Sequence, residues 1–169
     1  MGMSDYYRAL REKIGNQLIF MPSVAGIIRN EQGHILFGRK HGEPHWGLIA
    51  GSIELGEMPA DAMIREVKEE TGLDVIPERI LGVYGGEERR YTYGNGHQVE
   101  YLTIVFACRV ISGELDTENE EMVELAYFPE NQLPPTAVKY PKEIFVEAGG
   151  EQAHFEMSTM PLVKDRRRP

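Results

Sequence analysis

The sequence is poor in cysteine, and this bears on both its chemistry and its compartment. Its 169 residues include one cysteine, Cys108, so no disulfide can form within the chain. Cys108 lies in the apolar run TIVFACRV, which favours a buried apolar side chain over a catalytic nucleophile. The absence of disulfides fits a reducing environment, and we therefore expect a cytoplasmic location.

Long apolar runs are also lacking. The longest, LIFMPSVAGII, is interrupted by Pro22 and is too short to span a bilayer, which takes about 20 apolar residues. It lacks the basic start and the cleavage site of a signal peptide. We therefore expect no membrane-spanning segment and assign this run to the core.

Basic side chains are outnumbered by acidic ones. The chain has 18 Lys and Arg residues against 27 Asp and Glu residues, which gives a formal net charge of −9. Nucleic acids are held through their phosphates by clustered Lys and Arg, so this composition argues against a nucleic-acid partner. The basic run KDRRRP stands at the C-terminal end, where we expect a disordered tail over about residues 163–169.

The length suits one domain over residues 1–169, large enough to bury a core without disulfides. A short helix is expected at about residues 4–14, with Ser4 as its N-cap. Residues 23–30 and 34–40 predict a β-hairpin across the turn NEQG. Further strands are expected at 46–50, 78–86, 89–96, 98–110 and 124–129, and a closing helix at 141–150. This order predicts an α/β sandwich around a mixed β-sheet.

Residues 59–71 predict a helix on which like charges gather. Glu66, Glu69 and Glu70 are three and four positions apart, so they share one narrow arc of the helix. An apolar stripe points the opposite way and comprises Ala60, Met63, Ile64, Val67 and Thr71. We therefore expect the carboxylates to face away from the core. A solvated acidic surface is one interpretation, but their repulsion, unrelieved by Lys68, favours a site for Mg²⁺ or Mn²⁺.

The residues around this helix carry a longer motif with fixed spacing. From Gly51 to Leu73 the chain reads GSIELGEMPADAMIREVKEETGL, in which five residues separate Gly51 from Glu57 and seven separate Glu57 from Arg65. This resembles the Nudix box, G-x5-E-x7-R-E-U-x-E-E-x-G-U with U aliphatic, and every specified position is filled. The resemblance implies an α/β/α sandwich with a mixed sheet. It also implies cleavage of a nucleoside diphosphate linked to another group.

The resemblance also implies roles for residues of the box. The metal ligands would be Glu66, Glu69 and Glu70, while Glu57 and Arg65 would support the loop and helix as an ion pair. A bound divalent cation neutralises phosphate oxygens and helps to make hydroxide from water. Gly51 and Gly72 are interpreted as backbone requirements of tight turns around the helix.

Candidates outside the box rest on weaker patterns. The acidic loop DTENEEMVE offers Glu120 or Glu121 as a further ligand or general base, against the alternative of a solvated loop. Two more pairs are candidates for binding substrate: Arg39 and Lys40 on phosphate, and Tyr91 and Tyr93 stacking on a base. Surface or core roles for both pairs stay open.

These patterns together predict a Mg²⁺-dependent or Mn²⁺-dependent pyrophosphohydrolase of the Nudix type, related to MutT. A small nucleotide is the expected substrate, with nucleoside triphosphates first and ADP-ribose or a nucleotide sugar next. The proline that marks many ADP-ribose cleaving relatives is absent, since Glu88 and Arg89 stand there. The alternative is a catalytically silent Nudix-fold module that binds nucleotides and regulates. A homodimer is left open.

Overall fold

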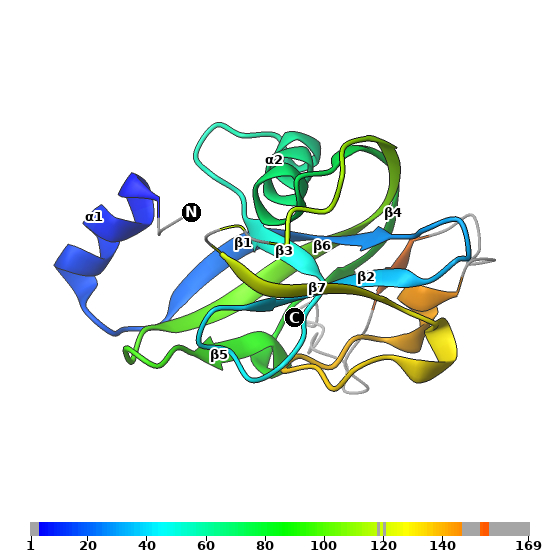
Figure 1. The fold of residues 1–169 in the computed structure, drawn as a ribbon. Coiled ribbons are helices and arrows are strands. Elements are labelled where there is room, and N and C mark those ends of the chain that lie inside the picture. Colours follow the sequence, from blue (N-terminus) through cyan, green and yellow to red (C-terminus); the bar gives the residue numbers. More distant parts are fainter. Residues whose placement is uncertain (1–3, 118, 120, 147–152, 156–169) are drawn as a thin grey trace, which may run out of the picture.

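The computed structural model describes residues 4–117, 119, 121–146 and 153–155 (Figure 1). Its helices are α1 (Asp5–Ile14) and α2 (Pro59–Thr71), with short 3₁₀ turns η1 (Glu87–Arg89), η2 (Glu130–Gln132) and η3 (Lys142–Phe145). The strands are β1 (Ile19–Ile28), β2 (Ile35–Lys40), β3 (Ile49–Ser52), β4 (Asp74–Tyr84), β5 (Arg90–Thr92), β6 (Gln98–Ser112), β7 (Met122–Phe128) and β8 (His154–Phe155).

The strands form one large mixed sheet and one small antiparallel sheet. The large sheet has the order β3-β1-β6-β4-β8, and β5 pairs with β6 beyond the end of β4, along the same edge of β6. β1 runs parallel to β6 and β4 runs parallel to β8, whereas β3 runs antiparallel to β1 and β4 antiparallel to β6. β2 and β7 form the second sheet. The predicted α/β class with a mixed sheet is therefore confirmed.

The hairpin expected from residues 23–30 and 34–40 is wrong. The turn itself forms, because the Asn30 side chain accepts a hydrogen bond from the His34 N–H at 2.9 Å. Between β1 and β2, however, the ladder of described residues is reduced to a single bridge from Arg29 to Ile35. β1 pairs instead with β3 and β6, and β2 pairs with β7, so partners far along the sequence separate the two strands.

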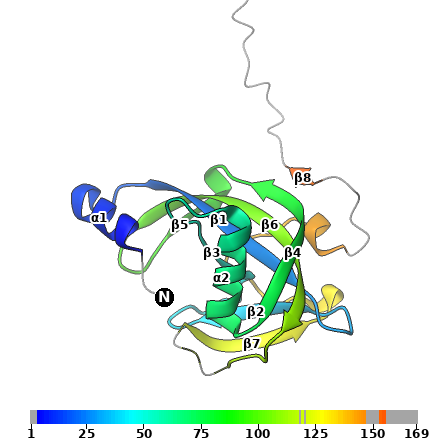
Figure 2. The ribbon, with the colours of Figure 1, turned by 90° about the horizontal axis from the view of Figure 1, so that it is seen from above.

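The large sheet carries a core on each face. On one face α2 lies across the strands (Figure 2) and packs Ala62, Met63 and Val67 into a buried cluster. On the other face η3 contributes Ile144 and Phe145 to a second cluster. Alternation along β1 and β6 supplies both clusters, because successive side chains of a strand point to opposite faces. The site described below lies on the α2 face.

The N-terminal helix forms as predicted and sits at one end of the molecule (Figure 1). The Ser4 side chain accepts a hydrogen bond from the Tyr7 N–H, as an N-cap does. The buried side chains of α1 are Tyr7 and Arg11, while Leu10 and Ile14 are partly exposed. Neither described helix is long and apolar enough to cross a membrane.

The closing helix expected at 141–150 is wrong over its described part. The chain makes the 3₁₀ turn η3 and becomes extended at Val146, with φ −77° and ψ 118°. Ile144 and Phe145 are nevertheless buried, so the apolar pair was correctly assigned to the core. Residues 147–150 and the predicted basic tail at 163–169 lie outside the described residues.

Candidate active site

α2 presents the acidic residues from a well-defined frame. Pro59 begins the helix, where its fixed φ and missing N–H are tolerated, and Met58 caps it without a side-chain hydrogen bond. Gly72 ends it in the left-handed region with φ +76°. A Cβ at Gly72 would also lie 2.8 Å from the carbonyl oxygen of Glu114. The positive φ and this close approach are both features that glycine accommodates and other residues do not.

The expected orientation of the carboxylates is wrong. Glu70 is fully buried and Glu66 is 8% exposed, so both face protein rather than solvent. Ala60 and Ile64 of the expected apolar stripe are exposed instead. The reason is tertiary: α2 rests on β1, β3 and β4, and one edge of the acidic arc is pressed against β3. There the Ala50 N–H donates a hydrogen bond to Glu70 Oε2 at 3.1 Å.

Lys40 balances the buried charge of Glu70. Its Nζ lies 2.5 Å from Glu70 Oε1 and donates to the Ala50 carbonyl oxygen at 3.4 Å. A register shift in the β2–β7 ladder between Arg39 and Lys40 marks a bulge, a feature that re-aims side chains. Lys40 was predicted to touch phosphate, and sequence gave no signal for its pairing with Glu70.

Burial and charge act against each other on this pair. Burial raises the pKa of Glu70 to about 7, although the Lys40 charge and hydrogen bond lower it. Burial lowers the pKa of Lys40, but the charges of Glu70 and Glu66 and the hydrogen bond to Glu70 raise it above its usual range. Burial also raises the pKa of Glu66. Negative charge at these carboxylates is thus poorly solvated and needs a cation beside it.

Arg65 organises the other edge of the acidic arc. Its Nε and Nη2 donate to the two carboxylate oxygens of Glu57 at 2.8 and 2.9 Å, so the expected ion pair is present. Its Nη1 donates to Glu66 Oε1 at 2.7 Å and Glu69 Oε2 at 3.3 Å, and its Nη2 to the Ser52 carbonyl oxygen. Arg65 hydrogen bonding lowers the pKa of Glu57. One guanidinium therefore ties the loop to the helix.

Gly51 is required for a reason that the sequence did not reveal. Its φ does not lie in the left-handed region, so the predicted tight turn is not what demands glycine here. A Cβ at this position would lie 1.9 Å from Glu66 Cδ and 2.1 Å from Glu66 Oε1. The Glu66 carboxylate thus lies where a side chain of residue 51 would begin.

The site offers oxygen donors for the divalent cation that the resemblance implies. Among the described residues, no three acidic, histidine or cysteine side chains come together as a ready metal site. The Glu70 carboxylate and the Ala50 carbonyl oxygen nevertheless contact the Lys40 ammonium, and the charge of the buried Glu66 acts on it as well, so a cation already lies among oxygen donors. Such oxygen donors are those that Mg²⁺ and Mn²⁺ prefer, so the residues fit the metal.

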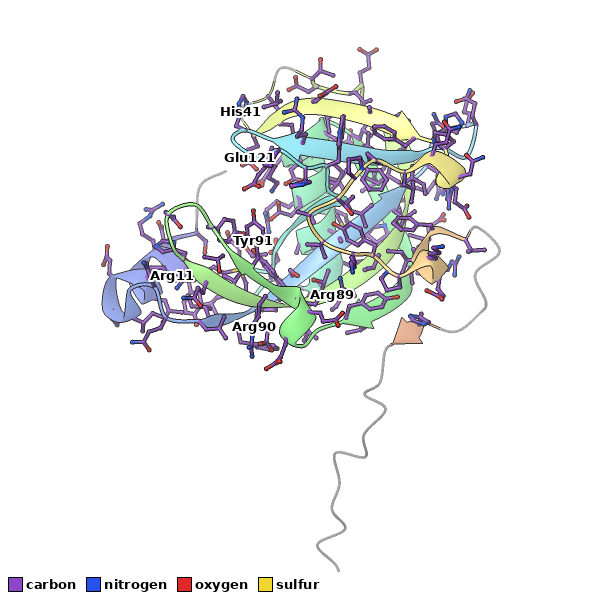
Figure 3. All side chains as sticks on the ribbon, turned by 90° about the horizontal axis from the view of Figure 1, so that it is seen from below. Arg11, His41, Arg89, Arg90, Tyr91 and Glu121 are labelled. Carbon is purple, nitrogen blue, oxygen red and sulfur yellow. The ribbon has the colours of Figure 1, made fainter. Side chains whose placement is uncertain are left out.

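The acidic loop before β7 contacts the end of α2 through a residue that was not predicted. Asn119 Nδ2 donates to the Glu70 carbonyl oxygen at 2.9 Å, and Asn119 Oδ1 accepts from the Glu121 N–H at 3.0 Å. The Glu121 carbonyl oxygen accepts from the His41 N–H at 3.1 Å, and these two residues lie together in Figure 3. Glu120 lies outside the described residues. The sequence signal that could have pointed to Asn119 is its position as an asparagine within an acidic run.

The remaining substrate candidates fall into two groups. Arg39 does not join the Lys40 site, because its Nη2 pairs with Glu124 at 2.8 Å on β7. Tyr91 and Tyr93 form an edge-to-face pair with their ring centroids 4.9 Å apart. Tyr91 (Figure 3) donates to Glu43 Oε2 at 2.9 Å, while the Tyr93 hydroxyl contacts that of Tyr101. The two tyrosines therefore lie together, and their stacking on a base stays a prediction.

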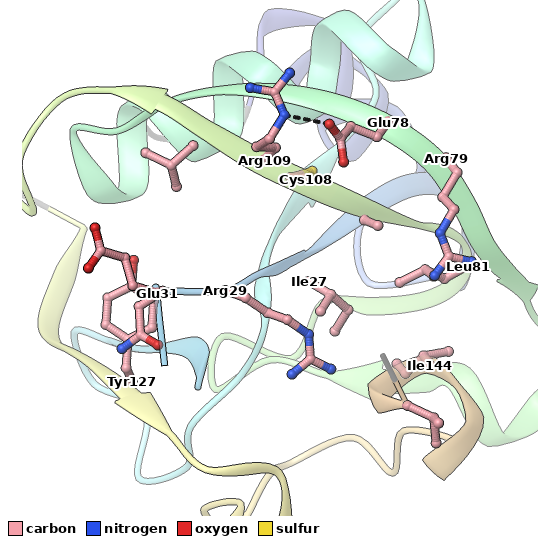
Figure 4. Close-up of a pocket in the computed structure, with 14 residues that line it drawn as sticks. Ile27, Arg29, Glu31, Glu78, Arg79, Leu81, Cys108, Arg109, Tyr127 and Ile144 are labelled. Atoms are coloured by element: carbon pink, nitrogen blue, oxygen red, sulfur yellow. Dashed lines mark hydrogen bonds and ion pairs between the residues drawn. The ribbon is translucent and has the colours of Figure 1, made fainter. Parts of the chain in front are cut away.

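A separate cavity of about 640 Å³ lies elsewhere in the fold (Figure 4). Its apolar lining includes Ile27, Leu81 and Ile144, and Arg109 pairs with Glu78 at its rim at 2.5 Å. None of the residues predicted for the site lines it. We therefore locate the candidate site on α2 by its charges and not by the volume of this cavity.

Comparison with known proteins identifies the family. The NUDIX domain model matches residues 19–148, which is most of the chain. The chain belongs to the Nudix hydrolase family. Among its Nudix relatives is the "ADP-ribose pyrophosphatase" of Methanocaldococcus jannaschii, 37% identical over 133 residues, 76% of this chain and 74% of that protein.

The chain is also similar to a second relative and to a solved structure. The "Putative ADP-ribose pyrophosphatase YjhB" of Bacillus subtilis is 34% identical over 116 residues. This match covers 69% of the present chain but only 53% of the Bacillus protein, so the chain spans about half of that relative. A crystal structure of a "UDP-X diphosphatase" superposes with a TM-score of 0.60 at 26% identity, covering 81% of this chain and 64% of that one.

Proposed function

We propose that this Nudix chain cleaves the diphosphate linkage of a small nucleoside diphosphate derivative with the help of Mg²⁺ or Mn²⁺. The observation that carries the proposal is the fully buried Glu70, held between a lysine ammonium and the backbone of Ala50. Burying a carboxylate without a partner is costly, so a protein retains one where a cation is needed. Glu66, Glu70 and the Ala50 carbonyl oxygen would hold the metal, with Glu69 beside them.

The surrounding residues support this chemistry in ways that follow from their contacts. A bound divalent cation neutralises phosphate oxygens and lowers the pKa of a water that it binds. Arg65 orients Glu66 and Glu69 while Glu57 fixes Arg65 from the loop. Gly51 leaves the volume that the Glu66 carboxylate fills. Lys40 supplies an ammonium for a substrate phosphate, and Glu121 is the remaining candidate for general base among the described residues of its loop.

ADP-ribose is the first substrate to test. Two of the relatives bear the name ADP-ribose pyrophosphatase, which moves this compound ahead of the nucleoside triphosphates that sequence patterns favoured. Tyr91 and Tyr93 would offer an aromatic surface for the base, since ring stacking tolerates different bases. A silent regulatory module is disfavoured, because such a module has no need to bury Glu70 beside Glu66.

Product analysis tests this proposal. ADP-ribose, UDP-sugars and nucleoside triphosphates would be incubated with Mg²⁺, with Mn²⁺ or with excess chelator, and the products separated by chromatography. We expect AMP and ribose 5-phosphate from ADP-ribose, or a nucleoside monophosphate and pyrophosphate from a triphosphate, and loss of turnover with chelator. Full turnover in chelator would contradict the metal site. Release of inorganic phosphate with a nucleoside diphosphate would contradict the cleavage position.

A further inference from the structure

We propose that Lys40 is a placeholder cation, whose ammonium occupies the place of the divalent metal and is released toward the substrate diphosphate when the metal binds. This inference rests on the proposed function, because it takes the metal site as given. It adds that the site is never left with unbalanced negative charge. It also adds that metal binding and phosphate binding are coupled through one side chain.

The Lys40 ammonium contacts oxygen atoms of the kind that also bind metal cations. Its Nζ lies 2.5 Å from Glu70 Oε1 and 3.4 Å from the Ala50 carbonyl oxygen, and it interacts with the charge of Glu66. Carboxylate and carbonyl oxygens are also what a hard divalent cation takes. An ammonium and a divalent cation repel each other, so the same oxygens cannot serve both at once.

Of the two cations beside the arc, Lys40 is the one able to leave. Its side chain is 44% exposed, whereas that of Arg65 is 23% exposed. Arg65 is held by both oxygens of Glu57 and by the Ser52 carbonyl oxygen, all on the loop before α2. Lys40 stands at the end of β2 on a flexible four-carbon stem. A divalent cation attracts the carboxylates with twice the charge of the ammonium, so Lys40 yields its place.

The released ammonium has an obvious new partner. A diphosphate brought to the site would carry negative oxygens into the region that Lys40 has left, and Lys40 would remain within reach because it is anchored in β2, paired with Met122 of β7. Its charge then counts toward substrate binding only in the metal-loaded protein. Before metal binds, the same charge is committed to Glu70.

The first experiment observes Lys40 directly in the wild-type protein. The ¹³Cε signals of labelled lysines are followed by NMR during a Mg²⁺ titration, with Lys40→Arg used to assign the Lys40 signal. We expect the Lys40 signal to move toward that of an exposed lysine, while the signal of Lys68, which pairs with Asp74 on the far side of α2, stays in place. An unmoved Lys40 signal at saturating Mg²⁺ overturns the placeholder but leaves the proposed metal site standing. A protein whose amide signals show no Mg²⁺ binding at all overturns the metal site instead.

The second experiment measures the coupling. A methylene-bridged analogue of ADP-ribose, which resists cleavage, is titrated by calorimetry into wild type, Lys40→Met and Lys68→Met, with Mg²⁺ and with chelator. We expect Lys40→Met to weaken binding about tenfold with Mg²⁺ and hardly at all with chelator, since a surface ammonium to phosphate contact is of this order. Lys68→Met should match wild type in both. Equal weakening with and without Mg²⁺ would show that Lys40 is free for phosphate before metal binds and would refute the exchange; thermal melts confirm that each variant is folded.

Discussion

Two ion pairs flank α2, and they differ in burial more than in chemistry. The loop pair, Glu57 and Arg65, has side chains 17% and 23% exposed and makes two parallel hydrogen bonds. The buried pair, Glu70 and Lys40, combines a fully buried carboxylate with a lysine whose side chain is 44% exposed. The pKa of Glu57 is lowered by Arg65, whereas burial raises that of Glu70 to about 7.

This difference in burial indicates that one ion pair supports the structure and the other takes part in the chemistry. A two-pronged arginine contact satisfies a carboxylate and holds it, which is what a loop next to a reacting centre requires. A carboxylate held away from water, with a single movable ammonium, remains ready for a stronger cation. We therefore assign the loop pair to structure and the buried pair to metal binding, and the following changes test that division.

The largest effect is expected when the buried pair loses its charge. Glu70→Gln should lower turnover about 100-fold or more, because metal binding and stabilisation of charge on phosphate are weakened together. Its unfolding free energy should change little, since glutamine still accepts from the Ala50 N–H and avoids a buried charge. Lys68→Ala is the matched control on the same helix, and kcat and thermal melts are measured for both. Equal losses in the two variants would show that Glu70 contributes no more to turnover than an exposed residue of the same helix.

A volume change beside the arc should have the next largest effect. Gly51→Ala places a Cβ where Glu66 Cδ lies, so the carboxylate must move. We expect turnover to fall about tenfold or more and stability to fall by about 1–3 kcal/mol, the usual cost of overpacking. Gly56→Ala, in a loop where a Cβ meets no atom but φ is +79°, is a control for backbone strain alone. A wild-type kcat in Gly51→Ala would show that the Glu66 carboxylate can move aside without loss of activity.

Breaking the loop pair should affect stability first. Arg65→Lys keeps the charge but loses the two parallel hydrogen bonds, so we expect unfolding in urea to become easier by about 1–3 kcal/mol. Arg8→Lys serves as the control, because Arg8 pairs with Asp5 where both side chains are largely exposed and the pair contributes little. If Arg65→Lys were as stable as Arg8→Lys, the loop pair would not hold the box together.

The smallest effect is a difference in pH dependence. The folded pKa of Glu70 is above its unfolded value, so its contribution to stability is present at low pH and is lost as pH rises from about 4.5 through about 7. The folded pKa of Glu57 is lowered, so its contribution is present above about 4.5 and is lost as pH falls through the folded pKa. Denaturation in chelator across this range should therefore show a fall above pH 5 that Glu70→Gln removes. A fall that persists in Glu70→Gln would assign the titration to another group.

Local patterns in the sequence were enough to predict most elements of this fold. The helix at 59–71 follows from its apolar period, the proline at its start and the glycine after its end, all of which act within a few residues. The strand at 98–110 follows from a long apolar run and is found as Gln98–Ser112. The hairpin failed because its turn is local but its strand partners are not.

The site was predicted by motif, but its geometry was not. Helical spacing shows that Glu66 and Glu70 share an arc, yet only the packing of α2 on β3 decides whether that arc meets water. Lys40 and Glu70 are thirty positions apart in the sequence, so no periodic pattern of residues predicts their pairing. The demand for glycine at position 51 likewise comes from a side chain on another element. Tertiary contacts of this kind cannot be read from one sequence.

Arg11 joins the N-terminal helix to the large sheet. Its guanidinium donates to the carbonyl oxygens of Gly15, Gln17 and Gln98, so one side chain both closes the end of α1 and fastens the helix to β6. The family match begins at residue 19, after this helix. α1 packs less extensively on the rest of the molecule than β1 does, since β1 lies between β3 and β6, so we expect the amide protons of α1 to exchange with solvent ahead of those of β1.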